Sequence, residues 1–134
     1  MRYLGIDFGE RRIGVAVSDQ AARMALVVGT IERRDDYSAI AELRTMAVER
    51  DVEGLVVGRP MHLDGRPSKM ALRAQRFGTR LAAACKLPIH FIDEALTSVE
   101  ASREHRSESG RGGGIDATSA CILLQDYLDQ ESRT

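Results

Sequence analysis

The chain of 134 residues has little of several residue types on which common binding sites depend. It has no tryptophan, and three tyrosines and three phenylalanines make up its aromatic content of 4%. Proteins that bind single-stranded nucleic acid by base stacking use more aromatic side chains than this. The three histidines, His62, His90 and His105, have no HxxxH or HExxH spacing, which argues against a zinc site.

Cysteines and long apolar runs are also scarce. Cys85 and Cys121 form no CxxC pair and fall in apolar helical patterns, so we interpret them as reduced core residues. No segment has the unbroken apolar length of a membrane span, and Met1 leads directly into a strand pattern rather than a signal sequence. These features predict a cytoplasmic protein without a membrane partner. The length predicts one domain over residues 1–134.

The net charge of −1 excludes a generally basic surface, but one segment is strongly basic. Residues 59–80 contain six basic residues and one acidic residue, a local charge of +5. Four of the six recur at i, i+4, i+7 and i+11, one stripe of a helix, which could follow a phosphodiester backbone or could be a solvated face. With one residue of the first hairpin, the candidate nucleic-acid contacts are Arg11, Arg59, Lys69, Arg73, Arg76 and Arg80.

The pattern of apolar residues predicts an α/β fold. Strands are expected over residues 3–7, 13–18, 24–31, 52–58 and 88–93. Helices are expected over 35–51 with Asp35 or Asp36 as N-cap, from Ser68 to about Cys85, from Thr97 to Arg103, and from near Asp116 onward with Ala117, Cys121, Leu124 and Leu128 buried. Residues 107–114 are rich in glycine and predict a loop. This order predicts a mixed five-stranded sheet, an antiparallel meander followed by αβαβ units, with helices on both faces.

Three carboxylates are placed at the ends of these elements. Asp7 ends the first strand, Glu94 ends the fifth, and Asp116 opens the last helix. If the first and fifth strands are neighbours, Asp7 and Glu94 meet at the carboxyl edge of the sheet, where open α/β sheets bind ligands. A site of carboxylate oxygens without histidine or cysteine suits Mg²⁺ or Mn²⁺. Asp7 could instead form a turn, Asp116 could be a plain N-cap, and the spacing does not decide between Asp93 and Glu94.

Four segments, GIDFGERRIGVAVSD, VVGRPMHLDG, FIDEALTSVEA and DATSACILLQDYL, together resemble the YqgF family, also called RuvX or Holliday-junction-resolvase-like. The resemblance runs from about Leu4 to Leu128. It implies an RNase H-like fold and a nuclease that uses Mg²⁺ or Mn²⁺ in 5′-end maturation of pre-16S rRNA in the bacterial cytoplasm. It also implies that Asp7, Glu94 and Asp116, rather than Asp93, are the catalytic metal ligands of a two-metal hydrolysis.

The sequence departs from the family pattern at two positions. The arginine that usually follows the glutamate is Ala95 here, and Arg59 stands where the family usually has an apolar residue. Both departures bear on how the substrate is held. The choice of RNA over DNA, the preferred metal and the mode of cleavage (endonuclease or exonuclease) therefore stay open.

Three other functions are compatible with parts of the sequence. The same site could serve a Holliday-junction resolvase or a DNA exonuclease in DNA repair, and symmetric junction cleavage would require a homodimer. The DFGERRIGVAV segment also resembles the first phosphate loop of actin-like ATPases, but that fold needs a pair of such domains. A non-catalytic RNA-binding or transcription factor would bind nucleic acid without metal-dependent turnover. Nucleic acid is the expected partner in all but the ATPase interpretation; RNA is expected first, and DNA is the alternative.

Overall fold

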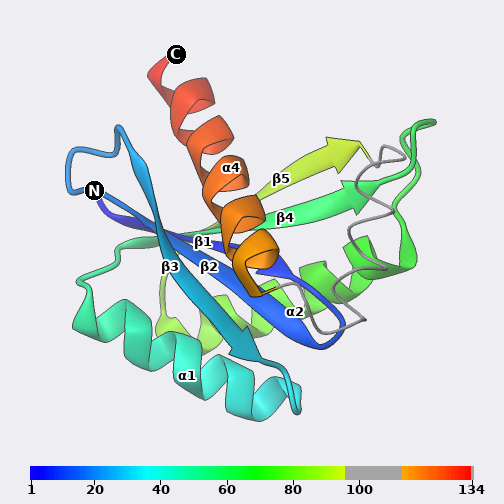
Figure 1. Cartoon of the computed structure of the whole chain (residues 1–134), viewed down its shortest axis with the longest axis horizontal. Coiled ribbons are helices and arrows are strands. Elements are labelled where there is room, and N and C mark those ends of the chain that lie inside the picture. Colours follow the sequence, from blue (N-terminus) through cyan, green and yellow to red (C-terminus); the bar gives the residue numbers. More distant parts are fainter. Residues whose placement is uncertain (96–112, 134) are drawn as a thin grey trace.

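The computed structural model describes residues 1–95 and 113–133, without the side chains of residues 95 and 113–116 (Figure 1). These parts of the chain form five strands and three helices: β1 (Tyr3–Phe8), β2 (Arg12–Ser18), β3 (Ala25–Glu32), α1 (Asp36–Glu49), β4 (Gly54–Met61), α2 (Lys69–Cys85), β5 (Ile89–Ala95) and α4 (Gly113–Ser132). The predicted helix from Thr97 to Arg103 and most of the predicted loop over 107–114 lie outside the described residues.

The strands form one mixed sheet in the order β3-β2-β1-β4-β5. β1, β2 and β3 pair antiparallel, whereas β4 pairs parallel with β1 on one side and with β5 on the other. The predicted meander and the predicted αβαβ order are therefore confirmed. The described part of the chain has one sheet with helices on both faces, as expected for this order of elements (Figure 1).

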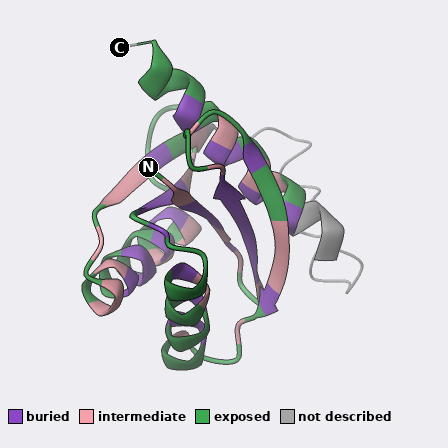
Figure 2. Ribbon diagram, turned by 90° about the vertical axis from the view of Figure 1, so that its left-hand side faces the viewer, coloured by how far each residue is buried: buried purple, intermediate pink, exposed green. Residues whose placement is uncertain are grey.

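Two apolar clusters hold the helices against the sheet. On one face, Leu43 of α1 and Phe77 of α2 pack with Ile6 and Leu55 of the strands. On the other face, α4 packs against Val56 and Ile92, among others. Figure 2 shows the buried residues concentrated in the strands and on the helix surfaces that face them. The strands are therefore covered by α1 and α2 on one face and by α4 on the other.

Side-chain caps start the first two helices. Asp35, not Asp36, is the N-cap of α1, since its carboxylate accepts a hydrogen bond from the Ser38 backbone N–H at 2.7 Å. This bond, with a second from the Ser38 hydroxyl, lowers the pKa of Asp35 below its usual value. At α2, the Ser68 hydroxyl accepts a bond from the Ala71 backbone N–H at 3.0 Å. Both starts agree with the preference of Asp and Ser for N-cap positions.

The last helix begins earlier than its sequence predicts. α4 starts at Gly113, three residues before Asp116, so Asp116 lies within the first turn and is not the N-cap. Glycine costs about 1 kcal/mol more than alanine in a helix, which is why the glycine run predicts a loop. The predicted stripe of α4 does pack on the sheet, with Ala117, Leu124 and Leu128 buried and Cys121 partly buried. Tertiary packing of this stripe therefore supports a helix that local propensity would start later.

The structure also describes the two cysteines and the apolar length of the helices. Cys85 and Cys121 are both free thiols and only partly buried, and the Cys121 thiol lies 3.3 Å from the Ala25 carbonyl oxygen that accepts its weak hydrogen bond. None of the helices in the described ranges is long and apolar enough to cross a membrane.

Candidate active site

The first and fifth strands are not neighbours, because β4 lies between β1 and β5. Leu55, Val56 and Val57 of β4 are fully buried, so this strand is apolar on both faces and suits an inner position. β4 is also longer than predicted, extending through Pro60 to Met61 by pairing with β5. Because β1, β4 and β5 are mutually parallel, Asp7 and Glu94 still lie at the same carboxyl edge of the sheet.

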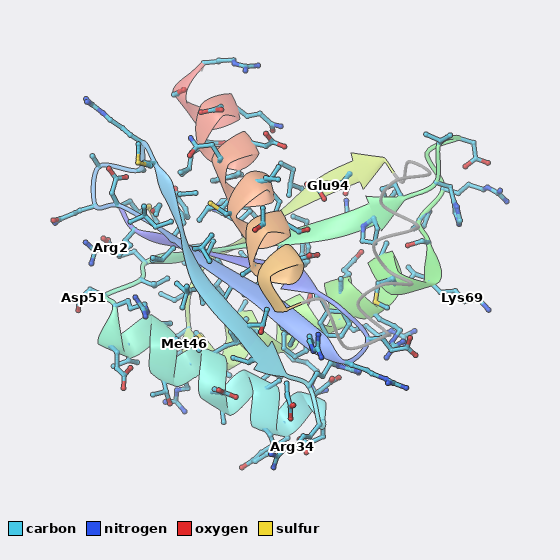
Figure 3. All side chains as sticks on the ribbon, viewed as in Figure 1. Arg2, Arg34, Met46, Asp51, Lys69 and Glu94 are labelled. Atoms are coloured by element: carbon cyan, nitrogen blue, oxygen red, sulfur yellow. The ribbon has the colours of Figure 1, made fainter. Side chains whose placement is uncertain are left out.

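Asp7 and Glu94 are on the same face of the sheet. Asp7 alternates with Ile6 and Phe8, which pack in the cluster under α1 and α2, so Asp7 is on the face covered by α4. Ile92 packs against α4, and Glu94, two residues further along β5, is on that face too. Figure 3 labels Glu94 at the end of β5.

Gly58 of β4 separates the two carboxylates. The register that pairs Ile6 with Val57 places Asp7 beside Gly58. A Cβ atom built on Gly58 would lie 3.9 Å from the Glu94 Oε2 atom, although Glu94 pairs in register with Pro60. The Glu94 side chain therefore reaches back over Gly58 in the direction of β1. No side chain of β4 fills this position, because residue 58 is glycine. Gly58 was not among the predicted site residues, although a glycine in a β-branched run often marks such a close approach.

The structure distinguishes Asp93 from Glu94, which spacing could not. Asp93 is on the opposite face, with its Oδ1 atom 2.6 Å from the Arg59 Nε atom. Arg59 also donates to the Gln75 Oε1 atom at 3.0 Å and lies 5.3 Å above the centre of the Phe91 ring. Asp93 is thus part of a contact between the sheet and α2. Arg59, a predicted nucleic-acid contact, is held on the α2 side, away from the face of Asp7 and Glu94.

The path of α4 determines where Asp116 lies. Tyr127 packs at the amino ends of the parallel strands, with its ring centre 5.3 Å from that of Tyr3 and 5.1 Å from that of His90. Leu123 lies over Gly58, closer to the carboxyl edge. The amino-terminal turn of α4, which includes Asp116, is therefore the end of the helix directed to the carboxyl edge. The side chain of Asp116 lies outside the described residues.

The predicted basic stripe is on α2, which covers the face opposite to Asp7 and Glu94. The first residue of the stripe, Lys69, is still near the carboxyl edge, because the preceding Ser68 donates a hydrogen bond to the Pro60 carbonyl oxygen (Figure 3). Arg80 is farther along α2 and has its NH1 atom 3.3 Å from the Asp36 Oδ2 atom. Arg73 and Arg76 lie between them on the same helix. Arg11 is exposed in the turn after β1, at the carboxyl edge.

The donor set of the site consists of carboxylate oxygens. Among the described side chains, no group of three His, Cys, Asp or Glu residues is close enough to hold a metal ion. Asp7 and Glu94 are two described carboxylates that flank Gly58 on one face. Oxygen donors of this kind fit hard divalent cations rather than zinc or copper.

Three comparisons with known proteins bear on the identity of the chain. The model of the RuvX family, described as Holliday junction resolvase, matches residues 1–130. A protein of Synechococcus elongatus named "Putative pre-16S rRNA nuclease" is 45% identical over 132 residues, which cover 96% of this chain and 89% of that protein. A protein of Paraburkholderia xenovorans with the same name is 43% identical over 129 residues, which cover 94% and 86%.

A solved structure shows the same fold. Thermus thermophilus RuvC in complex with a Holliday junction substrate superposes with a TM-score of 0.63 and covers 98% of this chain and 96% of that chain. At 17% sequence identity, this likeness shows the fold alone, which is RNase H-like. The family model covers nearly the whole chain, and the relatives are well above 30% identity. The chain therefore belongs to the RuvX family of Holliday-junction-resolvase-like nucleases.

Proposed function

We propose that this chain is a nuclease that hydrolyses nucleic-acid phosphodiester bonds with a divalent metal held by Asp7, Glu94 and Asp116. One observation carries the proposal. Asp7 and Glu94 are on one face, on either side of a glycine, while the adjacent acid Asp93 is paired with Arg59 on the other face. Two carboxylates that converge on one face of the sheet suit a bound metal ion better than they suit a solvated strand end.

The metal is Mg²⁺ or Mn²⁺ in this proposal, since the donors are carboxylate oxygens. When bound, it would stabilise the negative charge that develops on the phosphate and on the leaving oxygen. Asp7, on the central strand β1, is the ligand we expect to be shared within the site. Gly58 puts no side chain of β4 between the two carboxylates, and the buried Leu123 side chain of α4 lies over it. Asp116 completes the set from the first turn of α4.

The natural substrate we propose is the 5′ region of pre-16S rRNA, and the cell compartment is the cytoplasm. The names of the two relatives support this choice over other RNA substrates. In this proposal, Lys69 and Arg11, both near the carboxyl edge, contact the phosphate backbone close to the site. Arg59, Arg73, Arg76 and Arg80 would contact only a substrate that extends around the edge of the sheet onto the α2 side.

A second candidate is resolution of Holliday junctions, because the family model carries that description. This function would require two sites acting on opposite strands, hence a homodimer. The oligomeric state in solution and the preference between a four-way DNA junction and RNA therefore discriminate between the candidates.

The test uses end-labelled RNA and DNA of matched sequence, including a pre-16S leader and a four-way junction, with Mg²⁺, Mn²⁺ or EDTA. Asp7→Asn and Glu94→Gln are expected to reduce cleavage below about one hundredth of the wild-type rate, because each removes a charged ligand. Asp93→Asn is the matched control on the same strand and is expected to cleave like wild type. In EDTA, Asp7→Asn is expected to melt at or above the wild-type temperature, because one of the mutually repelling carboxylates is gone.

The results separate the candidate functions. Undiminished cleavage by Asp7→Asn with wild-type metal dependence would overturn the site. Equal loss in Asp93→Asn and Glu94→Gln would refute the assignment of the two faces. Nucleic-acid binding without metal-dependent cleavage of any substrate would favour the non-catalytic RNA-binding function.

A further inference from the structure

Arg12, the first residue of β2, has a buried donor without an acceptor. Its NH1 atom is inaccessible to solvent and has no hydrogen-bond partner, and it is the only such side-chain atom in the part of the chain that the structure describes. Buried polar side-chain atoms nearly always have a partner, so an exception calls for an explanation. A guanidinium is charged at all physiological pH values, and proton loss therefore cannot relieve the cost.

Arg12 lies on the same face of the sheet as Asp7. In the antiparallel pair of β1 and β2, Asp7 is opposite Gly14 and Phe8 is opposite Ile13. Ile13 and Phe8 both pack in the cluster under α1 and α2, so their neighbours Arg12 and Asp7 are on the α4 face. The two residues are diagonal neighbours across the strands, a separation that a long side chain spans. The buried donor is thus beside the proposed catalytic carboxylate.

A structural role for the Arg12 side chain finds no support among the described contacts. The acid directly across on β3, Glu32, has its carboxylate 3.9 Å from the Arg34 Nε atom, and both of these side chains are exposed. Arg33, by contrast, makes the hydrogen bonds expected of an arginine with a structural role. Its Nε atom is 2.9 Å from the Asp36 carboxylate, and its NH1 atom donates to the Glu10 carbonyl oxygen at 2.7 Å.

We propose that Arg12, a partly exposed residue, binds the phosphate group of the substrate at the Asp7–Glu94 site. A turn of the guanidinium would bring the inaccessible NH1 donor to a non-bridging oxygen. The guanidinium is the side chain best matched to phosphate oxygens, and burial strengthens such a charge-assisted bond. The positive charge also offsets the repulsion between the site carboxylates and the approaching phosphate. The identity of the phosphate as a nucleic-acid phosphodiester rests on the proposed function. The placement of the donor rests on the sheet register and on the burial of NH1.

The test measures binding, so that it does not depend on cleavage. A short fluorescein-labelled RNA is titrated with Asp7→Asn protein in Mg²⁺ at several salt concentrations, with and without Arg12→Gln. Loss of one phosphate contact is expected to weaken binding about 10- to 100-fold and to reduce the slope of log affinity against log salt by about one. Arg23→Gln is the matched control, because Arg23 is exposed in the β2–β3 turn at the opposite edge of the sheet. It is expected to leave affinity and slope unchanged.

Thermal stability separates a binding role from a structural one. Arg12→Met removes the unpaired donor but keeps much of the aliphatic volume, so its melting temperature is expected to equal or exceed that of wild type. A lower melting temperature together with wild-type RNA affinity would identify Arg12 as a structural residue and overturn the proposal. Unchanged affinity and salt slope in Arg12→Gln would overturn it as well. The wild-type protein could fail to cleave any substrate while Arg12→Gln still shows weaker RNA binding and a smaller salt slope. In that case the nuclease proposal fails and the phosphate contact stands.

Discussion

Replacement of Gly5 by alanine tests how closely α4 approaches the central strand. A Cβ atom built on Gly5 would lie 2.8 Å from the Leu124 Cβ atom and 3.2 Å from the Ala120 carbonyl oxygen. Neither atom can rotate away, because one is a Cβ and the other belongs to the helix backbone. The helix as a whole must therefore shift away from β1.

The expected cost follows from known effects of overpacking. An extra methyl group in a tightly packed core costs about 1–3 kcal/mol, and the lower backbone entropy of alanine in the unfolded chain returns about 0.5–1 kcal/mol. The difference is centred on a net loss of about 1.25 kcal/mol and is at most about 2.5 kcal/mol. For a chain of 134 residues, the entropy of unfolding is about 0.28 kcal/mol/K, so the melting temperature is expected to fall by about 4–5 °C.

The assay combines thermal unfolding, followed by circular dichroism, with metal-dependent cleavage. Cleavage is expected to fall in Gly5→Ala because α4 carries Asp116 in its first turn. Gly58→Ala is the comparison, since the nearest atom to its Cβ would be Leu123 Cδ2 at 3.0 Å, the movable end of a side chain. It should lower the melting temperature by less than Gly5→Ala does. Leu124→Ala should not rescue Gly5→Ala, because alanine keeps the Cβ atom at residue 124.

A melting temperature of Gly5→Ala at or above that of wild type would refute the reasoning. Recovery of stability by Leu124→Ala would also contradict it, because the obstacle would then be the outer part of the leucine side chain rather than the helix itself.

Two further predictions concern stability. Ser68→Ala removes a buried hydroxyl that caps α2 and donates to the Pro60 carbonyl oxygen. It is expected to lower the free energy of unfolding, measured in urea, by about 1–2 kcal/mol. An unchanged urea midpoint would contradict the capping role of Ser68. Burial raises the pKa of Tyr127 above its usual range, so the folded chain holds this proton more tightly than the unfolded chain does. Stability should therefore be constant with respect to Tyr127 below about pH 10 and fall as the pH rises further, and Tyr127→Phe should flatten that decline in unfolding measured against pH.

Local patterns in the sequence were sufficient for the elements and for the candidate acids. The i, i+4, i+7, i+11 stripe placed α4 on the sheet, and an Asp or Ser before each apolar stripe indicated where α1 and α2 begin, although only the structure decided between Asp35 and Asp36. These features depend on residues within one or two turns of each other, so they can be read from the chain directly. The resemblance to RuvX, confirmed by the family match, supplied the fold and the function class.

The tertiary structure decided how these pieces meet. Strand order depends on pairing between segments far apart in the chain, and no single segment encodes that β4 lies between β1 and β5. The same pairing turned Asp93 to Arg59 and Glu94 to the α4 side, and it brought the unpaired Arg12 donor to the face of Asp7. The basic stripe was read correctly as one side of a helix, but only packing determined that α2 covers the face opposite to the acids. A side-chain period shows which residues share a face, whereas only long-range packing shows what that face meets.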